Sequence, residues 1–159
     1  QKWTLFPYTT LFRSFNNLLP TDDRALIVFD NNLSFETSDF VNQKFDKILL
    51  VSNDNKNRQI ILSEKLIEFK NALIKDQKKR LNERSINCEI ITIEDLLKIK
   101  DKIYALYPEV GENLDYLNSN KLENISFLYR KIDQYSWKFC NKGFFNFKNY
   151  IPKIIQEFT

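Results

Sequence analysis

The sequence predicts an α/β fold, in which helices cover both faces of a mostly parallel sheet of about five strands. Short apolar runs alternate with helical segments, and this order is typical of a Rossmann-like three-layer domain. Two of the runs, ALIVF at 25–29 and KILLVS at 47–52, end in clusters of Asp and Asn. Continuous apolar runs of this length predict strands that are buried on both faces, as in a parallel sheet.

The clearest helix is expected at about 58–84. Its apolar residues step by four, three and four, so they share one face, and three further residues widen that face. The row is Leu62, Leu66, Phe69 and Leu73, widened by Ile67, Ile74 and Leu81. Further strands are expected at 88–93, 103–107 and 125–129, and shorter helices at 94–100, 112–118 and 151–158.

Residues 135–150 are dense in aromatic side chains, with Lys138, Lys142 and Lys148 between them. One interpretation is a surface for single-stranded nucleic acid, where aromatic rings stack on bases and cations lie near phosphates. The other is a set of rings packed under a loop or against a following domain. We expect 135–159 to lead toward a C-terminal domain that this chain lacks.

The N-terminal residues 4–14 read TLFPYTTLFRS, which is identical to one translated frame of a widely used sequencing adapter. We therefore expect residues 1–14 to be an artefact, and 15–159 to be a single α/β domain that is a fragment of a longer protein. Without the first fourteen residues, Lys and Arg fall from 24 to 22 against 21 acidic residues, so the net charge falls from +3 to about +1. The charge therefore offers no case for nucleic-acid binding.

The composition excludes several kinds of site within these residues. Because the chain has no histidine, a Ser-His-Asp or Cys-His site and a His-ligated metal are excluded. Gly111 and Gly143 are the only glycines, which excludes a GxGxxG turn and a P-loop. Two cysteines without a recognisable secretory leader predict a reducing, cytoplasmic compartment. No run approaches the roughly eighteen apolar residues of a membrane span, so no membrane partner is expected.

The candidate binding site lies at the carboxyl ends of the strands, where open α/β sheets bind their ligands. The candidates are Asp30, Asn31, Asn32 and Ser34 after the first strand, and Glu109, Gly111 and Glu112 after the fourth. The first cluster fits a polar ligand or a metal, but Asp and Asn are also common where a strand turns into a loop. An acidic residue such as Glu112 is also favoured in the first turn of a helix.

The order of elements resembles the amino-terminal α/β domain of the DNA photolyase and cryptochrome superfamily, over about 25–155. DNNLS at 30–34 is similar to GDQLS of the photolyase-related branch, and YPEVGE at 107–112 is similar to its EPGE turn. DKILLV and CEIITIEDL resemble its second and third strands, and GFFNFKNYIPKII resembles the segment that leads to the helical domain. The arginines of the WFRxDLR motif of typical photolyases have no counterpart here.

The resemblance implies a light-dependent DNA repair enzyme or a photoreceptor relative. In that family, excited reduced FAD in a helical domain donates an electron to a pyrimidine dimer and splits it. This chain would be the antenna or scaffold domain, with a chromophore between the loops 30–34 and 109–113. FAD is expected only in the missing helical domain, which would be the partner within the full-length chain. DNA would be bound only by the intact protein, so no activity is expected of this fragment alone.

Two other classes of function stay open. A nucleotide-sugar-dependent transferase fragment would coordinate a divalent cation through Asp30 or Glu109. A non-catalytic Rossmann-like interaction module, such as a receiver-like domain, would use Asp30 and Lys131 as phosphoacceptor and partner, although the acidic pair of such domains is missing.

Overall fold

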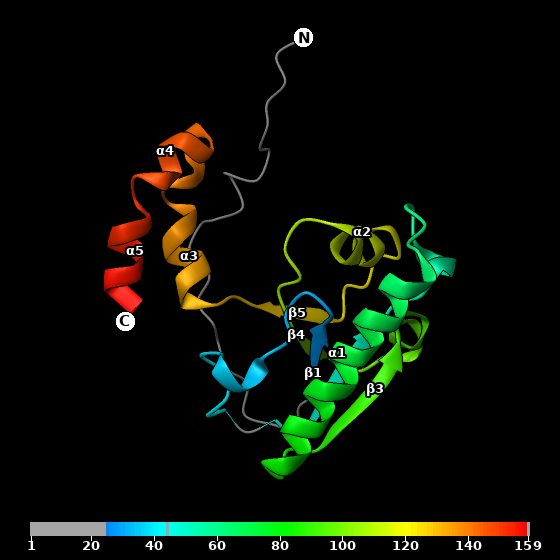
Figure 1. The fold of residues 1–159 in the computed structure, drawn as a ribbon. Coiled ribbons are helices and arrows are strands. Elements are labelled where there is room, and N and C mark those ends of the chain that lie inside the picture. Colours follow the sequence, from blue (N-terminus) through cyan, green and yellow to red (C-terminus); the bar gives the residue numbers. More distant parts are fainter. Residues whose placement is uncertain (1–24, 44, 159) are drawn as a thin grey trace. The chain divides into compact units, whose positions relative to one another are not determined.

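The computed structural model describes residues 25–43 and 45–158 (Figure 1). The adapter-like segment 4–14 and the lead-in 15–24 lie outside the described residues. What is described falls into two compact units, 25–128 and 129–158, which are treated separately below.

The first unit contains a five-stranded sheet with the order β3-β2-β1-β4-β5, in which every neighbouring pair is parallel. The strands are β1 (Ala25–Phe29), β2 (Lys47–Ser52), β3 (Cys88–Thr92), β4 (Ile103–Leu106) and β5 (Ile125–Leu128). The connections carry α1 (Glu64–Glu83), the 3₁₀-helix η4 (Ile93–Lys98) and α2 (Glu112–Ser119). The predicted α/β fold is confirmed, and the sheet is wholly parallel.

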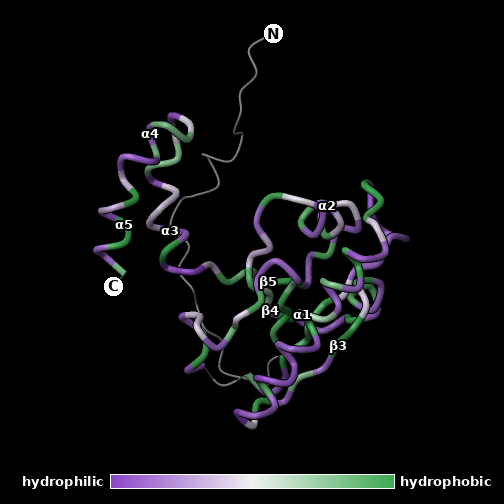
Figure 2. The backbone as a smooth tube through the Cα atoms, viewed as in Figure 1, coloured by the Kyte–Doolittle hydropathy of each residue, from purple (hydrophilic) through white to green (hydrophobic). Residues whose placement is uncertain are grey.

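Each face of the sheet packs against helices, because side chains alternate along the strands. Leu26 and Val28 of β1 point to the face covered by α1, where they join Ile74 and Leu81. On the opposite face a second cluster contains Ile27, Phe29, Ile93, Leu96 and Leu117, the last three from η4 and α2. The unit therefore has three layers, and the hydrophobic colour of the backbone at the β4 label belongs to a strand inside the sheet (Figure 2).

Helix α1 differs from its predicted form at its start and in the face that it buries. It begins at Glu64 instead of residue 58, because the Ser63 side chain accepts a hydrogen bond from the Leu66 amide and caps the helix. Its fully buried residues are Ile74, Gln77 and Leu81. Members of the predicted apolar row stay exposed instead: Leu66 by 40%, Phe69 by 58% and Leu73 by 40%.

The connection between β1 and β2 is held against α1 by polar contacts. It contains the short 3₁₀-helix η2 (Phe35–Thr37). The Ser34 amide donates to Gln77 Oε1, and Gln77 Nε2 donates to Glu36 Oε2 at 2.7 Å. Glu36 also forms an ion pair with Arg80. These bonds satisfy the polar atoms of Gln77, whose side chain is fully buried.

The second unit is helical and is held together by aromatic contacts. Its elements are α3 (Lys131–Trp137), η5 (Cys140–Lys142), α4 (Phe144–Lys148) and α5 (Ile151–Phe158), of which the sequence predicted only the last. Phe139 stacks on Tyr150 with ring centroids 4.5 Å apart, and Tyr135 meets Phe139 and Phe158 edge-on at 5.5 Å. These rings of the aromatic segment are used in packing within the unit. None of the described helices has the length and apolar character needed to cross a bilayer.

Candidate ligand site at the carboxyl ends of β1 and β4

The candidate site lies where the order of strands reverses. The chain passes from β1 to β2 and β3 on one side of the sheet, then returns to place β4 and β5 on the other side of β1. The loops that follow β1 and β4 therefore leave the sheet side by side. In open α/β sheets this reversal creates the crevice in which ligands bind.

Three asparagine side chains tie these two loops together. Asn31 Nδ2 donates to the main-chain carbonyl of Pro108, and Asn32 Nδ2 donates to that of Tyr107 at 2.9 Å. In the opposite direction, Asn113 Nδ2 donates a hydrogen bond to Asp30 Oδ1 at 3.0 Å. The structure thus brings Asp30, Asn31 and Asn32 against the loop after β4, because β1 and β4 are neighbouring strands.

A chain of alternating charges lies beneath these bonds. The Asp30 carboxylate is 2.5 Å from Lys70 Nζ and 3.8 Å from Arg58 Nη2, and Arg58 forms a second ion pair with Glu112. The Arg58 and Asp30 side chains are only 4% and 6% exposed. Since buried charges are tolerated when they are paired and hydrogen-bonded, this network fixes the position of each member.

The remaining predicted site residues shape the loops. Gly111 has φ of 148° directly before α2, a conformation that favours glycine, and Glu109 has φ of 62°. Ser34 also has a left-handed conformation, with φ of 73°, and its amide turns toward Gln77 of α1. Asp30, Asn31 and Glu112 are therefore joined through Asn113 and Arg58 in one side-chain network. Asn32 bonds the main chain of Tyr107 beside it, whereas the described bonds of Ser34 lead elsewhere.

Four residues of this network were not among the predicted site residues: Asn53, Arg58, Lys70 and Asn113. The Arg58 guanidinium donates to the Asn53 carbonyl at 3.0 Å, which joins the end of β2 to the site. A sequence signal existed for Asn53, because it opens a second Asn and Asp cluster after a buried strand. Arg58 and Lys70 gave no such signal, since single cations are common on surfaces.

Some buried polar atoms at this network do not form hydrogen bonds. Among the residues that the structure describes, Asn53 Nδ2, Asn53 Oδ1 and Arg58 Nε are buried side-chain atoms without a hydrogen-bond partner. Buried polar groups are rarely left unsatisfied, because each costs roughly 1–3 kcal/mol. The end of β2 therefore holds two donors and one acceptor that are buried without a partner among the described residues.

A small cleft adjoins the network on the α2 side and shares Glu112 with it. It has a volume of about 180 Å³ and is lined by Asn57, Gln59, Glu112, Asp115, Tyr116 and Ser119. Asn57 donates to Glu94 at 2.6 Å, and this bond is the main cause that lowers the pKa of Glu94. Burial, with a smaller contribution from Glu94, raises the pKa of Tyr116, so its phenol stays a neutral donor at the cleft.

The network is not arranged as a metal site. Within the described ranges no three Cys, Asp or Glu side chains come close enough together to hold an ion. Asp30, the first carboxylate proposed for a cation, is already partnered by Lys70 and Arg58. Its charge is therefore balanced by the protein itself.

Comparison with protein-family models, with curated proteins and with solved structures finds no match for this chain.

Proposed function

We propose that residues 25–128 are the antenna or scaffold domain of a photolyase- or cryptochrome-like flavoprotein, and that a chromophore binds at the β1–β4 crevice. The observation that carries this proposal is the direct joining of the loop 30–34 to the loop 107–113 through Asn31 and Asn32. These are the two segments on which the resemblance to GDQLS and EPGE rests, and they are far apart in the sequence.

The chemistry of the crevice supports a planar heteroaromatic ligand. A pigment that absorbs near-ultraviolet or blue light needs a conjugated ring system, and such rings commonly carry amide and ring-nitrogen edges. Asn53, at the end of β2, has a buried amide whose donor and acceptor, the two kinds of group that such an edge requires, have no partner among the described residues. The cleft of about 180 Å³ is smaller than the roughly 300–1,000 Å³ of drug-sized sites. The described residues would therefore enclose only part of the ligand.

The proposal assigns no catalytic residue to this chain. Dimer splitting would belong to reduced FAD in a helical domain of the full-length protein, and DNA would be bound only when that domain is present. The role of residues 25–128 would be to hold the light-harvesting group and to pack against the helical domain.

A ligand titration of the purified 159-residue chain tests this function. We expect flavin mononucleotide or a reduced folate to bind with a dissociation constant on the order of 10 μM, measured by absorption and fluorescence. Asn113→Ala removes the bond to Asp30 and should weaken binding about tenfold, which is roughly 1.4 kcal/mol. Asn118→Ala is the matched control, because Asn118 is exposed on the same helix. Failure of both ligands to bind would count against the proposal.

Ligand responses of the same purified chain distinguish the two other classes of function from each other. A nucleotide-sugar transferase fragment predicts a higher melting temperature with uridine or guanosine diphosphate in the presence of Mg²⁺ or Mn²⁺. An interaction module predicts no response to any of these small molecules. The pairing of Asp30 with two cations does not favour a divalent metal at that carboxylate.

A further inference from the structure

Helix α1 leaves a row of large apolar side chains on its surface. Leu66, Phe69 and Leu73 are 40%, 58% and 40% exposed, and Ile60 and Ile61 just before the helix are each 70% exposed. Single exposed apolar residues are normal on proteins, but a contiguous row on one helix is typical of an interface. We name Leu66, Phe69 and Leu73, together with the exposed Ala72, the α1 stripe.

None of the stripe residues belongs to the core cluster through which α1 packs on its own sheet. The helix contacts the sheet through the face that contains Ile74 and Leu81, with the buried Gln77 between them. The sequence of α1 thus has two neighbouring apolar sectors, of which the fold of this unit uses one. The second sector is available to another protein surface.

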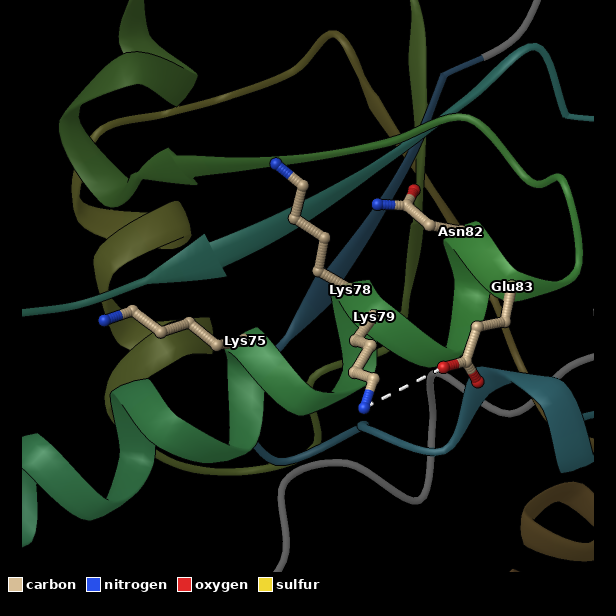
Figure 3. A pocket seen from close by; sticks show the side chains of 5 residues that line it. All are labelled: Lys75, Lys78, Lys79, Asn82 and Glu83. Carbon is tan, nitrogen blue, oxygen red and sulfur yellow. Dashed lines mark ion pairs between the residues drawn. The ribbon is translucent and has the colours of Figure 1, made fainter.

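The charges of α1 indicate the orientation of that surface. The N-terminal half of the helix is neutral, with Glu64 and Glu68 against Lys65 and Lys70, whereas its C-terminal half has a net positive charge and contains three lysines around a shallow hollow (Figure 3). Those lysines are Lys75, Lys78 and Lys79. Only Lys79 has a carboxylate partner among the described residues, Glu83 at 3.9 Å, and both side chains are largely exposed. An identical helix that runs parallel places the two positively charged halves together, whereas an antiparallel one places each of them beside a neutral half and so avoids this repulsion.

The register of the stripe is self-complementary in this orientation. Lys65, Phe69, Ala72 and Asp76 step by four, three and four, so they form one line along the helix. When a second copy is reversed against this line, Lys65 lies opposite Asp76 and Phe69 lies opposite Ala72. The large side chain of Phe69 then meets the small one of Ala72, and the cation of Lys65 meets the anion of Asp76. The twofold axis of the dimer repeats each of these pairs once.

We propose that the α1 stripe is a homodimer interface, in which α1 pairs antiparallel with α1 of a second copy of this chain. The proposal is independent of the proposed pigment site, because it uses none of the residues of that site. A single helix pair buries less surface than the roughly 1,600 Å² of a standard interface. We therefore expect a dissociation constant of the dimer on the order of 10 μM.

Sedimentation velocity of the full 159-residue chain over a range of concentrations tests this dimer. The wild-type chain should shift from monomer to dimer as concentration rises through the micromolar range, and Phe69→Glu should stay monomeric. Because Phe69 is 58% exposed, the variant should keep the circular dichroism and melting temperature of the wild type. A wild-type chain that stays monomeric to about 200 μM would overturn the proposal.

A charge exchange distinguishes this interface from any other. Lys65→Asp and Asp76→Lys should each weaken the dimer about tenfold, and the double variant should recover most of the loss. Lys102→Asp, at an exposed position outside α1, is the control and should leave the dimer unchanged. A dimer that is insensitive to Phe69→Glu, or a double variant weaker than either single one, would contradict the antiparallel α1 pair.

Discussion

The side chain of Asn32 donates to the main-chain carbonyl of Tyr107 at 2.9 Å, which joins the loops after β1 and β4 at the reversal of the sheet. Asn32 is 5% exposed, so water is not available to replace this bond. Because the bond spans two loops, it fixes the distance between them at the carboxyl ends of β1 and β4.

Asn32→Ala should therefore destabilise the α/β unit. The Tyr107 carbonyl would lose a buried donor, and such a loss costs roughly 1–3 kcal/mol in the free energy of unfolding. Urea denaturation followed by circular dichroism measures the change. Asn118→Ala, at an exposed position of α2, should change stability by less than about 0.5 kcal/mol. Equal effects of the two substitutions would show that the loop-to-loop bond contributes nothing.

The buried pair of Asp30 and Arg58 predicts strongly coupled effects. Arg58→Met leaves two carboxylates short of their cation, and Asp30→Asn leaves Arg58 and Lys70 short of their anion. Removing one member of a buried ion pair costs roughly 3 kcal/mol. The double variant should lose clearly less than the sum of the two single losses, as a double-mutant cycle of unfolding free energies would show. Additive losses would mean that the two side chains do not interact.

Gly111→Ala should be destabilising through the backbone alone. A Cβ at this position would meet no atom within 4 Å, so no steric clash contributes. The φ of 148° is nevertheless a conformation that L-residues rarely adopt, at a cost of roughly 1–3 kcal/mol. Val110→Ala, at a neighbouring side chain that is 71% exposed, should be nearly neutral. Thermal unfolding of both variants separates the effect of the φ angle from that of a general change in the loop.

The Cys88 thiol predicts a stability change at alkaline pH. Burial raises its pKa from 9.0 to about 11, against a smaller lowering effect of Lys78. The folded chain therefore holds this proton more tightly than the unfolded chain does, so the contribution of Cys88 is complete below pH 9. It is lost as pH rises toward about 11. The free energy of unfolding of the wild type, relative to that of Cys88→Ala, should therefore fall as pH rises from 9 toward about 11.

Thiol labelling gives an independent measure of the same group. Cys88 is buried and Cys140 is only partly buried, so a disulfide reagent at pH 8 should modify Cys140 first. In a Cys140→Ser variant, the remaining thiol should react far more slowly than a free cysteine. A Cys88 that reacts at the rate of a free thiol would contradict its burial beneath α1.

The strands and the polar clusters that follow them could be predicted because they depend on local patterns. ALIVF and KILLVS are continuous apolar runs that only a doubly covered sheet buries well, and the polar clusters after them mark where each strand ends. That the two loops line one cleft was an expectation drawn from the family resemblance, because the apolar runs alone do not give the order of the strands. The bonds of Asn31 and Asn32 then depend on the loop conformation, which no periodicity encodes.

The face of α1 that packs on the sheet could not be predicted from spacing. The row from Leu62 to Leu73 and the set Ile67, Ile74 and Leu81 are neighbouring apolar sectors of one helix, and periodicity does not say which sector meets the sheet. In the observed orientation of α1, Gln77 and Lys70 form polar contacts with the loop after β1. Such contacts join residues about forty positions apart, so no local signal reveals them.

Side-chain amide resonances test most directly whether a chromophore binds at the carboxyl ends of β1 and β4, as we propose. In nitrogen–proton correlation spectra of the chain titrated with flavin mononucleotide and, separately, a reduced folate, one ligand should shift the amide signals of Asn31, Asn32, Asn53 and Asn113. Those of Asn87 and Asn118, which are outside the crevice, should stay in place. Shifts confined to residues outside the crevice, or none with either ligand, would contradict the account.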